Sequence, residues 1–161
     1  MIDCTSDSEI LRVDNVTGGA AYVYDFDDIK ETVTFVQKLT VEELDDYSSF
    51  GQSVAIGGDH IVIGAPYYDD DEFEQGAVFI YYNGSYVWDL FSPNPANDTY
   101  FGESVAINSN RVIAVGAPGD RNETGSVYIF KLRVQWELVF TIEPDVPEMS
   151  YAGWSVAIDE E

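Results

Sequence analysis

Five carboxylates gather in one short stretch of the chain, YYDDDEFEQ, which contains Asp69, Asp70, Asp71, Glu72 and Glu74. Carboxylate oxygens suit hard cations such as Ca²⁺, so Asp69, Asp70 and Asp71 are weak candidate metal ligands. No glycine in this stretch is placed to reverse the chain tightly around an ion. The matching stretch of the repeat described below, GDRNET, has only two acids. A solvated acidic loop is therefore the favoured interpretation, with a loosely held cation as the alternative.

The histidine and cysteine content of the chain does not support nucleophilic catalysis. The chain has one histidine, His60, in the sequence GGDH, where we expect an exposed turn. One histidine in a turn offers no Ser-His-Asp or Cys-His arrangement, and no cysteine-histidine cluster suits zinc. The single Cys4 cannot form an internal disulfide. Catalytic residues are therefore predicted to be absent, although 30 acids leave room for a chance pair of glycosidase carboxylates.

Asparagine offers a different kind of chemistry. Four of the seven asparagines begin an Asn-x-Ser/Thr triplet, the acceptor sequence for N-linked glycans. These are Asn15, Asn83, Asn97 and Asn122. All four fall where loops or strand ends are expected, as glycan acceptors must. The pattern indicates an extracellular protein or a cell-surface ectodomain, with chance occurrence in loops as the alternative.

Charge and hydrophobicity together restrict the class of protein. The chain of 161 residues has 7 basic and 30 acidic residues, a formal net charge of −23, yet 45% of it is hydrophobic and 14% aromatic. So much apolar material indicates a folded core, which places the charge on the surface. Such a surface repels nucleic acid and favours cationic or metal-bridged partners, although acidity also serves solubility alone. No stretch approaches the length of a membrane span, and no signal peptide is visible.

The elements that carry these residues repeat along the chain. SFGQSVAIGGDHIVIGAP begins at Ser49, YFGESVAINSNRVIAVGAP at Tyr100, and a third copy starts as YAGWSVAI at Tyr151. The glycines at 51, 102 and 153 are each 51 residues apart. A glycine followed by an apolar, aromatic run recurs at Gly19, Gly76 and Gly125. A fixed period of this length is typical of solenoids and propellers.

Each period contains four short runs of β-branched and aromatic residues, separated by turn residues. In order they are the SVAI run, the run ending in Gly-Ala-Pro, the glycine-led aromatic run and a run such as YVWDLF. Tight turns such as GGD and YNGS predict antiparallel hairpins. The second and third runs are apolar throughout, which predicts strands covered on both faces. Four such strands in about fifty residues predict a propeller blade.

The recurring motifs resemble the FG-GAP repeat, the family that forms the seven-bladed propeller of integrin α chains. The resemblance extends from about Gly19 to Ile158 and does not single out an integrin. The residues that carry it are Phe50, Gly51, Gly64, Ala65, Pro66, Phe101, Gly102, Gly116, Ala117, Pro118 and Gly153. It implies that the two phenylalanines fill the gaps between blades. The third copy has alanine at this position, which predicts a different filling.

The family also implies Ca²⁺, held by an Asp-x-Asp-x-Asp-Gly loop between the first two strands of a blade. The corresponding stretches here, Gly57 to His60 and Asn108 to Arg111, are too short and too poor in carboxylates. No cofactor is therefore assigned with certainty. The family's calcium site is not transferred to either complete blade.

The expected fold is all-β, an incomplete propeller of about three blades. Residues 1–18 form an N-terminal segment or partial strand, 19–49 the last two strands of a blade, 50–100 and 101–151 complete blades, and 152–161 the first strand of another. An alternative is that EILRVDNV supplies a poor second strand of the first blade. Residues 155–158 could then pair with the N-terminal strands and close a three-bladed ring. The favoured interpretation is a fragment of a longer propeller, or a chain that contacts other copies of itself.

Topology places all the long loops on one face and the short hairpins on the other. Long loops on a rigid scaffold are where binding usually resides. The predicted partner-binding residues are Tyr67, Tyr68, Asp69, Asp70, Asp71, Glu72, Asp98 and Asp120. They suggest a non-enzymatic adhesion or recognition module for a protein or glycan partner. The alternatives are an accessory propeller domain of a larger hydrolase or sensor protein, and a propeller glycosidase.

Overall fold

The computed structural model describes residues 8–12, 18–41, 44, 47–69 and 73–159. Within them the chain forms three antiparallel sheets and one short helical turn. The elements are β1 (Ser8–Arg12), β2 (Ala21–Asp27), β3 (Thr32–Leu39), β4 (Ser53–Gly57), β5 (His60–Ala65), β6 (Ala77–Tyr82), β7 (Ser85–Phe91), β8 (Ser104–Ile107), β9 (Val112–Ala117), α1 (Asp120–Glu123), β10 (Ser126–Leu132) and β11 (Trp136–Ile142). This confirms the predicted all-β class.

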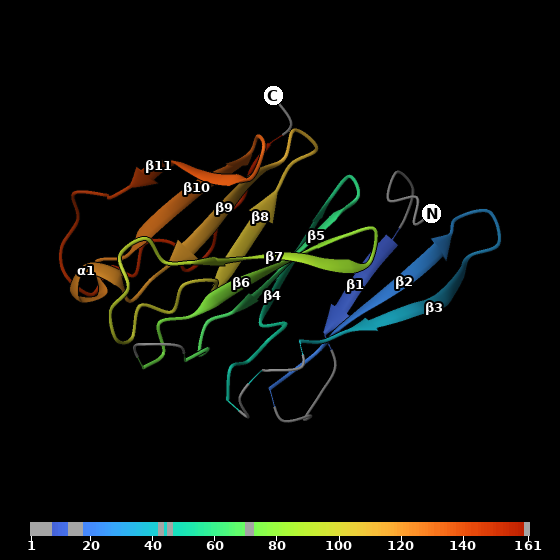
Figure 1. Cartoon of the computed structure of the whole chain (residues 1–161), viewed down its shortest axis with the longest axis horizontal. Coiled ribbons are helices and arrows are strands. Elements are labelled where there is room, and N and C mark those ends of the chain that lie inside the picture. The colour runs from blue at the N-terminus through green and yellow to red at the C-terminus, as the bar shows by residue number, and fades with distance from the viewer. Residues whose placement is uncertain (1–7, 13–17, 42–43, 45–46, 70–72, 160–161) are drawn as a thin grey trace.

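The sheets are propeller blades in which neighbouring strands follow one another in the chain. Their strand orders are β1-β2-β3, β4-β5-β6-β7 and β8-β9-β10-β11. The blades fan out side by side, with the middle one between the other two (Figure 1). The segment EILR pairs with β2 as β1, at the place of the second strand of a blade. No strand is assigned over residues 152–159, although Ala152 forms an isolated parallel bridge with Gly125.

The middle blade is covered on both faces, as its continuous apolar strands predict. All six residues of β5 and five of the six in β6 are buried. In β5, Ile61 and Ile63 belong to the cluster shared with the first blade, whereas Val62 belongs to the cluster shared with the third. In β10 buried residues alternate with partly exposed ones. The same strand type therefore has two burial patterns, according to how many blades flank it.

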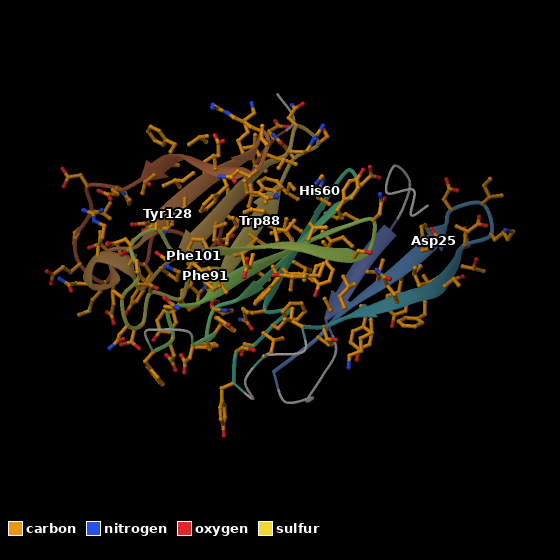
Figure 2. The ribbon with its side chains drawn as sticks, in the orientation of Figure 1. Asp25, His60, Trp88, Phe91, Phe101 and Tyr128 are labelled. Atoms are coloured by element: carbon orange, nitrogen blue, oxygen red, sulfur yellow. The ribbon has the colours of Figure 1, made fainter. Side chains whose placement is uncertain are left out.

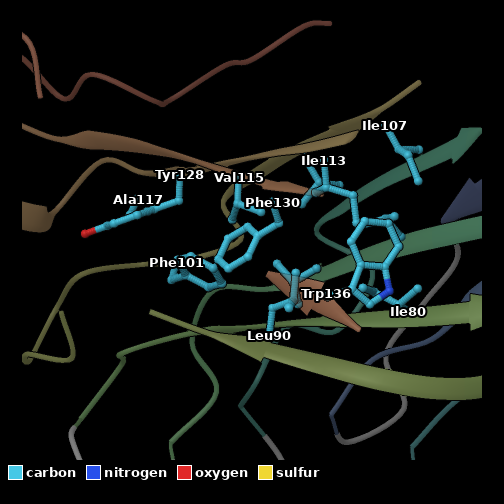
Figure 3. Packing of buried hydrophobic residues seen from close by; sticks show 13 residues of the cluster. Ile80, Leu90, Phe101, Ile107, Ile113, Val115, Ala117, Tyr128, Phe130 and Trp136 are labelled. Carbon is cyan, nitrogen blue, oxygen red and sulfur yellow. The ribbon is translucent and has the colours of Figure 1, made fainter. Parts of the chain in front are cut away.

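Two phenylalanines fill the gaps between blades. Phe50 packs against Phe79 and Tyr81, with ring centroids 5.4 and 6.5 Å apart. Phe101 packs against Tyr128 and Phe130, at 5.7 and 6.1 Å. Figure 3 shows the second cluster, in which Phe101 lies among side chains of the third blade close to Leu90 of the middle one. Each gap between two blades is thus filled by one phenylalanine ring, which comes from the segment that leads into the second of the two blades.

The third copy is filled differently, as its alanine predicts. Ala152 is only partly buried, and the ring of Tyr151 lies edge-on to the ring of Trp154 at 6.3 Å. Both rings remain well exposed. The backbone hydrogen bond at this position is nevertheless present, since the amide of Ala152 donates to the carbonyl of Thr124 at 2.9 Å. The same bond joins Phe101 to Gln75 and Phe50 to Gly18.

The glycine and serine motifs form one joint between blades. The hydroxyl of Ser53 donates to the carbonyl of Gly102 at 2.7 Å, and Ser104 does the same to Gly153 at 2.7 Å. The Gly102 carbonyl also lies against the α-carbon of Gly64, where a β-carbon would come within 2.0 Å of it. The SVA serine and the GAP glycine of one blade therefore hold the FG glycine of the next, which explains the recurring motif.

His60 differs from the sequence-based expectation of an exposed turn. It opens β5 and is 7% exposed, between the ring of Tyr82 at 4.9 Å and the ring of Trp136 at 5.8 Å. The prediction was wrong because Trp136 comes from the third blade, far along the chain. Burial lowers the pKa of the imidazole, the nearby charge of Arg111 lowers it further, and Asp59 acts in the opposite direction.

We expect the stability of the protein to fall as the pH drops from about 7.5 to about 5.5. The pKa of His60 lies lower in the folded state than its ordinary value of about 6.5, so the unfolded chain takes up the proton first. The contribution of neutral, buried His60 to the free energy of unfolding is fully present at pH values above about 6.5. It is lost progressively as the pH falls below that value. Urea unfolding at a series of pH values measures the effect. His60→Gln should remove the slope between pH of about 6 and 7.5, since no other histidine exists; an unchanged slope contradicts the assignment.

Candidate interface on the long-loop face

The loops that connect the second to the third strand of a blade, and the fourth strand to the next blade, emerge at one end of the molecule. We define the long-loop face by its described residues Tyr47, Tyr67, Asp69, Phe73, Glu74, Asp98 and Tyr100. The opposite end carries two-residue turns, one formed by Gly58 and Asp59 and the other by Asn83 and Gly84. In Figure 1, α1 lies at the end where the connections before β6, β8 and β10 gather.

Backbone hydrogen bonds fix three of these loops to one another. The amide of Asp98 donates to the carbonyl of Phe73 at 2.9 Å, and the amide of Tyr100 donates to the carbonyl of Glu74 at 3.2 Å. Further along, the amide of Gly119 donates to the carbonyl of Thr99 at 3.2 Å. The loop before β6, the loop before β8 and the loop before β10 therefore form one continuous surface. These bonds hold the described parts of the three loops together without a bound partner.

Two tyrosines lie at the centre of this face. The rings of Tyr67 and Tyr100 meet edge to face with centroids 5.5 Å apart. Burial raises the pKa of Tyr100 to about 12, helped by the carboxylates of Asp98 and Glu74. Burial also raises the pKa of Tyr67, helped by Glu103 and Glu74. Both phenols therefore stay protonated at neutral pH and can donate hydrogen bonds.

The same face is strongly acidic. Residues 66–76 and 92–103 contain no lysine or arginine. Asp69 is exposed, and its carboxylate also accepts the amide of Glu74, which holds the loop in shape. A hollow of about 460 Å³ opens between the loops and is lined by Tyr47, Ser49, Tyr67, Asp69, Phe73 and Glu74. Tyr47 and Phe73 are 84% and 58% exposed there. Carboxylates beside exposed aromatic rings can bind ammonium or guanidinium groups.

Asp120 is the clearest correction to the predicted partner-binding residues. It is 2% exposed, and its carboxylate accepts hydrogen bonds from the hydroxyl of Tyr128 and the side-chain amide of Asn94. Burial and this carboxylate raise the pKa of Tyr128. In the repeat, Tyr68 stands in the place of Asp120 and packs edge-on to Phe79 at 5.8 Å. Asp120 is therefore a buried structural group of the third blade.

The remaining predicted residues are distributed as follows. Tyr67 and Tyr68 are half-buried, and Asp69 and Asp98 are exposed. Asp70, Asp71 and Glu72 lie outside the described residues, as does Asn15. The other glycan acceptors, Asn83, Asn97 and Asn122, are exposed. Residue-type patterns missed Tyr47, Phe73 and Tyr100. A signal for Tyr100 exists, since a tyrosine also precedes the start of the third copy at position 151.

Calcium does not fit the family's usual position in these blades. Gly57 pairs directly with His60, so only two residues form the turn. In the next blade, Asn108 uses its side-chain oxygen to cap the amide of Val112 and its nitrogen to reach Asp159. Arg111 adds a positive charge to that loop. Among all described residues, no three histidine, cysteine or carboxylate side chains are grouped as metal ligands.

No helix within the described ranges is both long and apolar enough to cross a membrane.

The profile of the FG-GAP repeat matches residues 33–81 and 89–130. Human integrin alpha-6 is 40% identical over 99 residues, which covers 52% of this chain and 9% of that protein. Integrin alpha-6 of Gallus gallus is 35% identical over 129 residues, which covers 68% of this chain and 12% of that protein. The matched region thus spans about a tenth of the length of these relatives. By its sequence and by the structure of its blades, the chain belongs to the FG-GAP repeat family.

Proposed function

We propose that this protein is a non-enzymatic recognition module that binds a partner through its long-loop face. The partner presents lysine or arginine side chains, or is bridged by a divalent cation. A protein partner is favoured over a glycan, because cationic groups are common in proteins. The observation that carries the proposal is the acidic, tyrosine-bearing surface formed by the loops before β6 and β8, which backbone hydrogen bonds join to each other and to the loop before β10.

The electrostatics of the face support a cationic partner. Asp69, Glu74 and Asp98 surround two protonated phenols, and the loops that hold them have no basic residue. A lysine or arginine entering the hollow beside Tyr67 would meet carboxylates and aromatic rings together. Because the loops are already joined by hydrogen bonds, little conformational entropy is lost on binding. Such contacts favour rapid, salt-dependent association.

An extracellular location is part of the proposal. Three of the four sequons place their asparagine at an exposed position, as attachment of a glycan requires. The relatives named above are integrin alpha-6 chains. In this setting adhesion is the role that we propose for the module.

A binding screen with charge-matched variants tests the proposal. The chain is applied to an array of purified ectodomains, with and without EDTA. The test variant is Asp69→Asn/Glu74→Gln/Asp98→Asn. The control is Asp25→Asn/Asp28→Asn/Glu31→Gln, which removes the same charge from exposed positions around the β2–β3 turn. Figure 2 shows Asp25 on the first blade, far from the long loops.

We expect binding to at least one ectodomain to weaken about tenfold or more in the test variant and to persist in the control. Loss of binding in EDTA indicates a bridging cation, and retention indicates direct contact with basic side chains. Equal losses in both variants would indicate non-specific attraction to the overall charge. That outcome, or ectodomain binding that ignores the test variant, contradicts the proposal.

A further inference from the structure

The opposite end of the molecule contains a groove between the second and third blades that the proposed function does not use. It has a volume of about 500 Å³. Its walls are the β6–β7 hairpin on one side and, on the other, the β8–β9 loop and the β10–β11 turn. The lining residues are Asp59, His60, Tyr82, Val87, Trp88, Ser109, Arg111, Leu132, Val134, Gln135 and Trp136. Figure 2 shows His60 and Trp88 in this part of the molecule.

The joint between the first two blades is built differently at the corresponding position. At the joint between the first and second blades, the side-chain amide of Gln37 donates to the carbonyl of Gly84 at 3.2 Å. Gln37 pairs with Val23, and Trp88 pairs with Ile80 at the equivalent register position. One joint is thus closed by a hydrogen bond, whereas the next presents an indole that is 40% exposed.

The lining combines apolar walls with a cation. Val87 and Val134 are 45% and 99% exposed, which leaves aliphatic surface uncovered. Arg111 is exposed and forms no ion pair with the carboxylates of the described residues, whereas the neighbouring Arg133 is paired with Glu137 at 3.5 Å. The lining also offers polar groups, including Asp59, Ser109 and Gln135. Hollows of this size that combine apolar walls with polar groups are typical of ligand sites.

We propose that this groove binds an extended peptide segment of a protein partner that carries a carboxylate between large apolar side chains. The carboxylate pairs with the guanidinium of Arg111. The apolar side chains cover Val87, Trp88 and Val134. A backbone amide of the segment can also donate a hydrogen bond to the carboxylate of Asp59. A simple anion has no such donor, so the groove favours a peptide over a free anion. The exposed aliphatic surface of Val87 and Val134 favours the apolar side chains of a peptide over a saccharide.

Two blocked tripeptides that differ only in charge test the proposal with the intact chain. The probes are acetyl-Leu-Asp-Leu-amide and acetyl-Leu-Asn-Leu-amide, followed by tryptophan fluorescence. Only one of the three tryptophans, Trp154, lies outside the groove. At low salt we expect the aspartate peptide to bind about fivefold more tightly than the asparagine peptide.

Three variants assign the response to the groove. Arg111→Gln should make the two peptides bind equally, whereas Arg133→Gln, which removes a paired charge outside the groove, should leave their ratio unchanged. Trp88→Gln installs the residue found at the equivalent position of the first blade and should weaken both peptides about tenfold. Because Trp88 is 40% exposed, this variant should fold, as circular dichroism can check.

Several outcomes would overturn the proposal. These are equal binding of the two peptides to the unmodified chain, no saturable response up to about 10 mM peptide, and undiminished affinity for both peptides in Trp88→Gln. Glucuronate and N-acetylglucosamine serve as competing probes. Saturable binding of either sugar without peptide binding would assign the groove to a saccharide. The long-loop variant is used in parallel: loss of ectodomain binding there with intact peptide binding separates the two proposals.

Discussion

Replacing Phe101 with alanine is expected to destabilise the protein by about 3–5 kcal/mol. The ring is completely buried and packs between the second and third blades against Tyr128 and Phe130. It enters from the loop before β8, so no neighbouring strand can move in to fill the space. The cavity would lie at the joint, and the loss should appear as a lower urea midpoint for both blades together.

Phe140→Ala is the matched control. Phe140 is an aromatic residue of β11 that is 64% exposed in the described structure, so its loss should change the free energy of unfolding by about 0.5 kcal/mol or less. A Phe101→Ala variant as stable as this control would mean that the joint does not depend on the buried ring. Two separate unfolding transitions would instead show that the blades unfold independently.

Replacing Gly64 with alanine is expected to cost at least about 3 kcal/mol, because the new methyl group has no space. Its β-carbon would come within 2.0 Å of the carbonyl oxygen of Gly102 and 2.3 Å of the hydroxyl of Ser53. The first of these atoms belongs to the backbone of the next blade, and Gly102 is itself held at a φ of 93°. Either the blades separate or the bond from Ser53 breaks.

Thermal unfolding of Gly64→Ala alongside Gly58→Asn tests this prediction. Gly58 lies in the β4–β5 turn at a φ of 57°, and a β-carbon added there would have no other atom within 4 Å. Asparagine tolerates this backbone conformation, so the control should remain close to the original stability. If the two variants unfold alike, a small shift of the blades relieves the close approach at Gly64, and the joint is not rigid.

The shared geometry of the joints also explains why Ser53 and Ser104 belong to the repeat. Each serine donates to a carbonyl 49 positions further along the chain. That carbonyl can approach only because the GAP glycine beside it has no side chain. The motif residues are therefore complementary across blades, and each copy is completed by its successor. Substitutions at either partner should show coupled effects on stability.

Local sequence patterns are sufficient to predict the four-stranded blade. Period, turn residues and apolar runs specify four antiparallel strands, since these patterns depend on neighbouring residues and on hairpins of a few positions. The glycines at positions 51 and 102 could be identified as special from their spacing alone. The face on which the long loops gather also followed from the order of the strands. These features depend on neighbouring residues or recur at a nearly constant spacing, so they can be recognised in the sequence alone.

The contacts of particular side chains could not be predicted from the sequence, because they depend on how the blades pack. His60 is buried by Trp136, Asp120 by Tyr128 and Asn94, and Tyr67 meets Tyr100. Trp136 and Tyr100 come from the blade that follows, or from its entry loop. Gln37 closes the preceding joint with a hydrogen bond, whereas Trp88 at the equivalent position borders the groove. Such contacts depend on how blades stack, and stacking brings together residues whose separation in the chain follows no local pattern.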